Sequence, residues 1–274
     1  MSAGKRFTAL LALYFLTTSS ACFSDGIRPG QPPLLVMIID DLGNHFSQGV
    51  RAIQLPGDLT YGIMPHTPQA KRLARYAKKY SALYHDKKEV IIHMPMESDH
   101  RLTGGGLDSR QDRQIFSRTL REAMREIPDA RGLNNHMGSK LTRMSEQMDW
   151  LMAELKASSL YFIDSKTTLG SAAAAAADKS AIPRLSRDIF LDHDPDPKAI
   201  DRAYKKALRL ARQRGLAVVI AHPYPTTLRY LERQLPKLAH SPIALVSAGD
   251  AIRIRRIRSG DQRIAQVFPR PTRK

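Results

Sequence analysis

Short segments rich in apolar residues recur along the chain, separated by longer stretches that mix apolar and polar positions. The first covers residues 34–39 and reads LLVMII without interruption. Aliphatic runs of this length are typical of parallel strands buried on both faces. We expect further strands in five segments, at 59–64, 90–94, 160–163, 216–221 and 243–246, and two weaker strands elsewhere.

Helical periodicity marks the stretches between these strands. Apolar residues recur every three to four positions in four segments, at 70–77, 115–127, 144–155 and 200–211. Thr67 and Pro68 supply an N-cap and a first-turn proline for the first helix, and Pro128 ends the second. Pro197 and Gly215 bound the fourth helix. The third carries a stripe of methionines, which we interpret as core packing.

Strands that alternate with helices predict an α/β fold with a mainly parallel sheet. The number of strands favours a barrel or distorted barrel over an open sheet. The chain has 274 residues, of which 42% are hydrophobic, and a single cysteine, so the fold must depend on its core and not on disulfides. We place this domain at residues 34–252. The alanine run at 172–177 fits either a short helix or a low-complexity loop.

The first 22 residues have the features of a secretory signal. Lys5 and Arg6 precede an apolar stretch at 9–17, and small residues follow it. We predict a signal peptide or an uncleaved N-terminal anchor in residues 1–22, so that the protein is exported and lies in the periplasm or is membrane-anchored facing it. Cys22 leaves lipid attachment open. Glycines and prolines make residues 23–33 a linker.

The charge balance is strongly basic, with 43 Lys and Arg against 26 Asp and Glu and a net charge of +17. Such a field favours anionic partners. The sequence contains no helix-turn-helix pattern, zinc-finger spacing or aromatic-basic RNA-binding motif, so nucleic acid is not the favoured partner. Residues 253–274 form a basic C-terminal tail, which we expect either to aid solubility or to contact anionic lipid or polymer of the cell envelope.

Polar residues suited to catalysis occur where five of the strands end. Because the C-terminal ends of parallel strands lie on one face of a sheet, we expect these side chains to converge on one site. They are, in chain order, Asp40, Asp41, His93, Glu97, Asn134, Asn135, His136, Asp164 and His222.

The residue types indicate metal-dependent hydrolysis. Asp41 and two histidines would supply one oxygen and two nitrogens, which is a ligand set of catalytic zinc sites. Asp40 is then placed to act as a general base and His222 as a general acid. Because neighbouring residues of a regular strand face opposite ways, we expect the Asp pair to lie where the strand gives way to a loop, as Gly43 indicates.

Each of these residues also has a purely structural explanation. Asp40 and Asp41 fit a helix cap or turn, His136 a hydrogen-bonded loop residue, and His93 a buried core histidine. His193, in the sequence DHD, fits a turn and helix cap first. The coincidence of five such positions favours a real site.

At these positions the sequence resembles the divergent polysaccharide deacetylases, exported bacterial proteins related to carbohydrate esterases. The resemblance implies a deformed (β/α) barrel of the polysaccharide deacetylase and glycoside hydrolase type. It covers residues 34–250 and rests on IIDDLG at 38–43, HMPME at 93–97, NNHMGS at 134–139, FIDS at 162–165 and AHP at 221–223.

The resemblance also implies roles for individual residues. In related enzymes a first aspartate is the base and the next binds metal, which correspond to Asp40 and Asp41. It implies likewise that His136 binds metal and that His222 assists the leaving group. Related enzymes carry a second metal-binding histidine four residues after the first, where this sequence has Lys140. We take His93 as its substitute.

The leading functional hypothesis is therefore deacetylation of a cell-envelope glycan, with a divalent metal, Zn²⁺ first, held by Asp41, His93 and His136. Glu97, Asn135 and Asp164 are the residues expected to bind substrate. An alternative is a catalytically inactive protein on the same fold that binds glycan or serves envelope maintenance. A glycosidase is a weaker alternative, because adjacent carboxylates do not flank a bond from opposite sides.

Overall fold

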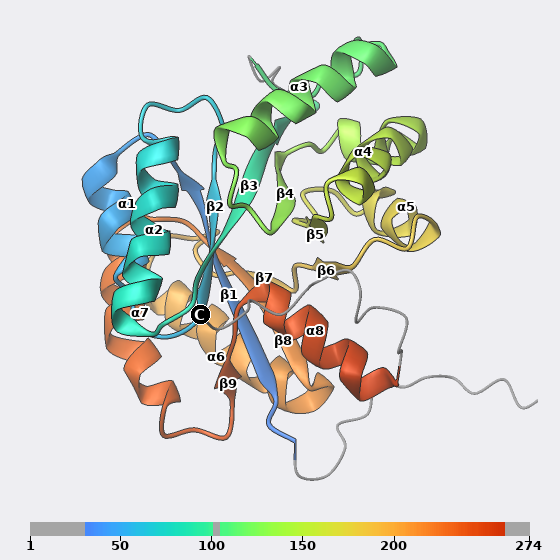
Figure 1. Cartoon of the computed structure of the whole chain (residues 1–274). Helices are drawn as coiled ribbons and strands as arrows, with labels where there is room; N and C mark the ends of the chain where they lie inside the picture. The colour runs from blue at the N-terminus through green and yellow to red at the C-terminus, as the bar shows by residue number, and fades with distance from the viewer. Residues whose placement is uncertain (1–30, 101–104, 261–274) are drawn as a thin grey trace, which may run out of the picture.

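The strands form one curled parallel sheet, and helices cover its outer face (Figure 1). The computed structural model describes residues 31–100 and 105–260. Its strands are β1 (Leu34–Leu42), β2 (Leu59–Ile63), β3 (Lys88–Met96), β4 (Gly132–Met137), β5 (Tyr161–Asp164), β6 (Arg184–Ser186), β7 (Ile189–Phe190), β8 (Leu216–Ala221) and β9 (Ala244–Leu245).

The strand order is β6-β5-β4-β3-β2-β1-β8-β7, with β9 paired to β1. Every pairing in this sheet is parallel. Strands β6 and β7 form the two edges, so the curled sheet is a half-barrel and not a closed one. The deformed (β/α) barrel predicted from the sequence is confirmed.

The helices connect the strands and alternate with them along most of the chain. They are α1 (Phe46–Ile53), α2 (Ala70–Tyr84), α3 (Arg113–Glu126), α4 (Ser145–Ala157), α5 (Ala173–Lys179), α6 (Pro197–Arg214), α7 (Pro225–Leu238) and α8 (Ala248–Ser259). The methionine stripe of α4 is confirmed as core, since Met148 and Met152 are buried. The alanine run forms the short helix α5.

Helix ends follow local chemistry, with one correction. Helix α6 begins after Asp196, whose side chain accepts from the next two backbone amides, and ends at Gly215 with φ 78°. The N-cap predicted at Thr67 is wrong. Helix α2 begins at Ala70, and Thr67 Oγ1 instead donates to the Met64 carbonyl at 2.7 Å.

Alternation along the strands divides their side chains between the barrel interior and the layer under the helices. On β1, Val36 and Ile38 face the interior, whereas Met37 and Ile39 belong to the larger core beneath the helices. The interior is a buried apolar cluster of Leu34, Val36, Ile38, Ile91, Tyr161, Ile163, Leu185, Val218, Ile220, Ala248, Ala251 and Ile252. It forms an apolar floor below the carboxyl ends of the strands.

Helix α8 closes the opposite end of the barrel, where the strands begin. Ala248, Ala251 and Ile252 pack into the interior cluster. The basic segment expected from residue 253 starts inside this helix, which continues to Ser259. Residues 261–274 and the predicted signal or anchor at 1–22 lie outside the described residues. Within the described part, no helix is both long and apolar enough to cross a membrane.

Candidate metal and catalytic site

The side chains that face the barrel interior change from apolar to polar at the carboxyl ends of the strands. On β1 the interior-facing residues Val36 and Ile38 are followed on the same face by Asp40. On β3, Ile91 is followed in the same way by His93. Asn134 and His136 occupy the equivalent positions of β4, and His222 directly follows β8. The period of two therefore brings residues far apart in sequence onto one polar layer.

Asp41 joins this layer because β1 is irregular at its end. The pairing of β1 with β2 shifts register between Ile39 and Leu42, and Asp41 has φ 58°. A bulge of this kind re-aims a side chain that regular alternation would turn away. We expected the Asp pair to lie where the strand becomes a loop. The structure instead keeps both residues inside β1 and breaks the alternation within the strand.

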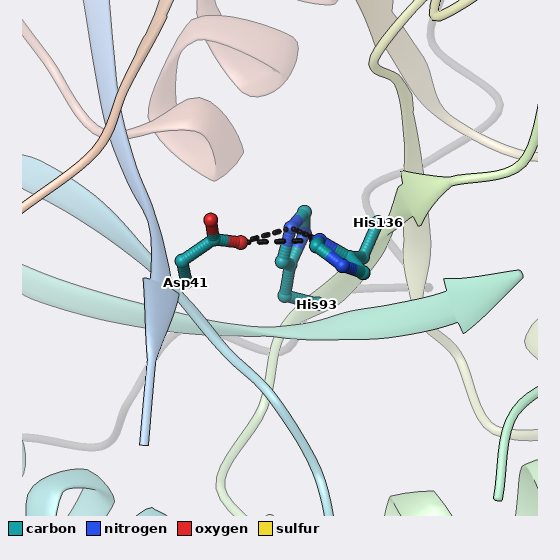
Figure 2. Close-up of side chains that lie close together, drawn as sticks. All are labelled: Asp41, His93 and His136. Atoms are coloured by element: carbon teal, nitrogen blue, oxygen red, sulfur yellow. Dashed lines mark hydrogen bonds and ion pairs between the residues drawn. The ribbon is translucent and has the colours of Figure 1, made fainter. Parts of the chain in front are cut away.

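The side chains of Asp41, His93 and His136 point toward one another (Figure 2). Asp41 Oδ1 lies 3.1 Å from His93 Nε2 and 3.1 Å from His136 Nδ1. The two histidine nitrogens are also 3.1 Å apart. Ligands about 2.1 Å from a tetrahedral cation are about 3.4 Å from one another. The triangle thus fits three ligands of a single metal ion, and the predicted set of Asp41, His93 and His136 is brought together.

The electrostatics of the triangle favour a positive charge at its centre. Burial raises the pKa of Asp41, but hydrogen bonds and charges from His136 and His93 outweigh it and hold that pKa well below its usual range. Burial lowers the pKa of His93, whereas the charge of Asp40 and the contacts with Asp41 raise it to about 9. A bound cation would supply the same positive charge.

Asp40 lies deeper than the triangle and is 1% exposed. Burial raises its pKa, which the neighbouring His93 only partly offsets. Its Oδ2 accepts a 2.7 Å hydrogen bond from Asn134 Nδ2. Its Oδ1 is buried and accepts no hydrogen bond from the described residues. Gly62 leaves room for this oxygen, because a Cβ there would lie 2.0 Å from it.

His222 stands on the other side of Asp41, with its Nε2 3.9 Å from Asp41 Oδ2. Its Nδ1 lies 2.9 Å from Asp192 Oδ1, and its ring is flanked by Phe190 and Tyr224. Burial lowers the pKa of His222, but the hydrogen bond and charge of Asp192 outweigh burial and raise it. A protonated Nε2 facing the site suits a general acid.

The sequence predicts Asn134 at the site without a role of its own, and it does not predict Asp192 there. Asn134 shares the interior-facing parity of His136, which was available from the sequence. Asp192 follows β7, a strand of two residues, and nothing in the sequence indicated that β7 pairs with β8 beside His222. From the sequence alone, Asp192 in DHD fits a turn.

Of the three residues expected to bind substrate, two face away from the barrel interior. Asn135 and Asp164 have the outward parity of their strands. Asn135 Oδ1 accepts from Ser165 N at 2.9 Å, and Asp164 accepts from Lys166 N at 2.8 Å and from Ser171 Oγ at 3.0 Å. Both side chains thus hold the loop that follows β5, and their substrate role stays a prediction.

Glu97 lies one residue beyond β3 and is paired with Lys140. Lys140 Nζ is 2.8 Å from Glu97 Oε1, and Ser109 N donates to the other oxygen at 2.8 Å. Lys140 occupies the position where related enzymes were expected to carry a second metal-binding histidine. Its ammonium is engaged by Glu97, and His93 from the neighbouring strand completes the triangle in its place.

A family model for divergent polysaccharide deacetylases matches residues 37–252, which contain the triangle, Asp40 and His222. The chain belongs to the divergent polysaccharide deacetylase family. This deacetylase-family chain is 32% identical over 218 residues to an uncharacterized protein of Haemophilus influenzae, covering 79% of this chain and 75% of that one. It is 31% identical over 248 residues to the uncharacterized Escherichia coli protein YibQ, covering 90% and 72%.

A solved structure confirms the fold of this deacetylase-family chain. The crystal structure of an uncharacterized Agrobacterium tumefaciens protein superimposes with a TM-score of 0.75 at 17% identity, covering 83% of this chain and 92% of the other. At that level of identity the likeness concerns the fold alone. A shared fold does not establish a shared reaction, so the chemistry of the site depends on its own residues.

Proposed function

We propose that this divergent polysaccharide deacetylase is a zinc-dependent hydrolase that removes acetyl groups from an acetylated polysaccharide of the cell envelope. The observation that carries the proposal is the triangle of Asp41, His93 and His136 with a buried carboxylate on one side and an oriented histidine on the other. The predicted N-terminal signal or anchor supports an envelope location.

The donor set fits the proposed ion. Two imidazole nitrogens and one carboxylate oxygen leave a fourth position open, as in catalytic zinc sites. A divalent cation held there would lower the pKa of a water molecule and polarise the acetyl carbonyl. The convergence of Asp41 Oδ1, His93 Nε2 and His136 Nδ1 at equal 3.1 Å separations supports this assignment.

The chain's own residues would then move the protons. Asp40 accepts the proton of the attacking water at Oδ1, since Asn134 occupies Oδ2. The raised pKa of Asp40 makes it a stronger base than an exposed carboxylate. His222 donates from Nε2 to the sugar nitrogen or oxygen as its bond to the acetyl carbon breaks. Asp192 holds the other ring nitrogen during this transfer.

Lys140 favours a second candidate function, which is glycan binding without hydrolysis. A lysine paired with a buried glutamate stands where related enzymes were expected to use a histidine, so the chain departs from the usual ligand pattern. The same site without hydrolytic activity would bind a glycan and would still present His222 and Tyr224 to it. Tyr224 is 45% exposed beside His222 and offers an aromatic face to a sugar ring.

Metal content and acetate release test the proposal together. Purified full-length protein should bind one Zn²⁺, and Asp41→Ala and His136→Ala should lose it. Asp40→Asn should keep the metal and lose acetate release from acetylated peptidoglycan fragments or chitooligosaccharides. His45→Ala is the control, because this exposed histidine precedes α1 without any side-chain cap. Metal-free wild-type protein under every loading condition would refute the hydrolase, and glycan binding without acetate release would favour the second function.

A further inference from the structure

Asn134 lies between the proposed base and one of the proposed ligands and touches both. Its Nδ2 is 2.7 Å from Asp40 Oδ2, and its Oδ1 is 2.8 Å from His93 Nδ1. The side chain is fully buried. Asp40 and His93 come from β1 and β3, which are separated in the sheet by β2, so Asn134 on β4 joins them across the barrel interior.

The direction of these two hydrogen bonds fixes the amide orientation. An ionised carboxylate only accepts, so the atom of Asn134 that faces Asp40 must be the NH₂ group. Its carbonyl oxygen therefore faces His93 and accepts a hydrogen from Nδ1. In the neutral ring the hydrogen is then on Nδ1 and the lone pair is on Nε2, the atom that points at Asp41 and His136.

We propose that Asn134 is a positioning residue that sets the tautomer of His93 for metal binding and at the same time leaves Oδ1 as the working oxygen of Asp40. The inference deepens the proposed function, on which it rests for the identity of base and ligand. Partners that hold the second nitrogen of a ligating histidine fix its tautomer and orientation in known metal sites. Here one amide would do this and hold the base as well.

The neighbouring Asn135 gives a matched control within the same strand. It is 1% exposed, and its amide donates to Met137 O at 2.7 Å and to Thr167 Oγ1 at 3.5 Å and accepts from Ser165 N at 2.9 Å. It faces the opposite way and touches neither Asp40 nor His93 in the structure. Asn135→Ala should therefore disturb folding as much as Asn134→Ala without the specific effect on zinc affinity and on the Nδ1 hydrogen of His93.

The experiment compares Zn²⁺ affinity, by competition with a chelator, among folded full-length variants. Asn134→Ala should bind Zn²⁺ about 10- to 100-fold more weakly than wild type. Asn135→Ala should stay within about two-fold of wild type. Asn134→Asp keeps an acceptor for His93 Nδ1 but loses the donor to Asp40. It should therefore bind Zn²⁺ better than Asn134→Ala while acetate release falls with the loss of the positioned base.

A second readout is independent of metal and of activity. The Nδ1 hydrogen of His93 should give an imidazole ¹H–¹⁵N signal protected from solvent exchange in wild type and Asn135→Ala, and lost in Asn134→Ala. Wild-type Zn²⁺ affinity in Asn134→Ala would overturn the proposal, as would equal loss in Asn134→Asp. Failure of wild type to bind Zn²⁺ would refute the proposed function. In that case the protected signal and its loss in Asn134→Ala would still support the positioning role, and an unchanged signal would overturn it.

Discussion

Asp192 holds His222 by two contacts at once. Its Oδ1 lies 2.9 Å from His222 Nδ1, and its Oδ2 accepts the His222 backbone N–H at 2.7 Å. The second oxygen also accepts from Thr227 Oγ1 at 2.9 Å. The ring cannot turn without breaking the first bond, and the second contact fixes the position of the His222 backbone. The free Nε2 is thereby aimed at the proposed metal triangle.

Asp192→Asn should therefore reduce kcat by about 10²-fold or more while leaving bound zinc unchanged. The charge of Asp192 contributes to the raised pKa of His222. Without that charge His222 loses its proton at a lower pH, so the alkaline limb of the pH–rate profile should move to lower pH. Steady-state kinetics across pH on an acetylated glycan would measure both effects.

Thr227→Val provides the matched comparison for this dyad. It removes one donor to Asp192 Oδ2 and leaves the contact with His222 Nδ1 in place. We expect a loss of about 1 kcal/mol in the free energy of unfolding and little change in the alkaline limb. An unchanged profile in Asp192→Asn would show that the carboxylate does not tune the histidine.

Gly62 should not tolerate a side chain. A Cβ at this position would lie 2.0 Å from Asp40 Oδ1 and 3.2 Å from the His93 Cβ. Gly62→Ala should displace Asp40, lower acetate release sharply and destabilise the fold by about 1–3 kcal/mol. Gly170→Ala is the control, since its Cβ would meet only Arg143 at 3.4 Å. Equal activity in the two alanine variants would contradict the proposed position of Asp40 in catalysis.

The pairing of Glu97 with Lys140 should stabilise the fold at neutral pH, and this contribution should be lost in acid. Burial raises the pKa of Glu97, but hydrogen bonds from Lys140 and Ser109 outweigh it and lower the pKa below its ordinary 4.5. A depressed folded-state pKa stabilises the protein above 4.5 and loses that contribution as pH falls through the folded value. Glu97→Gln should therefore flatten the decline of unfolding free energy below pH 4.5.

Urea unfolding at pH 7, 4.5 and 3 would measure this difference. Lys140→Met, which keeps most of the length of the side chain and removes its charge, should flatten the same decline without changing zinc affinity. A large loss of zinc in Lys140→Met would mean that Lys140 acts on the metal site directly, against the pairing seen in the structure.

The sequence was sufficient for the parts of the site that lie on long strands. The apolar run before Asp40 and the run before His93 placed both residues at one edge of a parallel sheet, and the structure brings them together. The two-residue period of a strand also distinguishes the polar residues that face the barrel interior from those that face outward. Asn134 shares parity with His136, whereas Asn135 and Asp164 have the outward parity of their strands.

The rest depended on features without a local signal. The register shift that turns Asp41 inward arises from the pairing of β1 with β2, and pairing is not written in either segment alone. Asp192 follows a two-residue strand that exists only through its neighbour β8. Short edge strands carry too few residues for a periodic pattern, so the sequence predicts a turn at a residue that such a strand positions.

Substitutions at the amino end of the barrel should change the stability of the fold and leave zinc binding and acetate release unchanged. Buried Glu89 accepts a hydrogen bond from Tyr161 Oη at 2.6 Å and from Gly249 N at 2.9 Å. Gly249 lies in the first turn of α8, so the contact ties the closing helix to β3. Glu89 precedes His93 by four residues on the same face, a separation of about 13 Å.

Tyr161→Phe should therefore cost about 1–3 kcal/mol of unfolding free energy, because Glu89 would lose a buried donor. Tyr204→Phe is a sharp comparison. Tyr204 is 4% exposed, and its hydroxyl has no hydrogen-bond partner among the described residues, so its removal should be neutral or stabilising. Both variants should retain wild-type zinc affinity and acetate release. A kinetic defect in Tyr161→Phe would contradict the division of the barrel into a chemical end and a structural end, because no contact in the structure joins Tyr161 to the triangle.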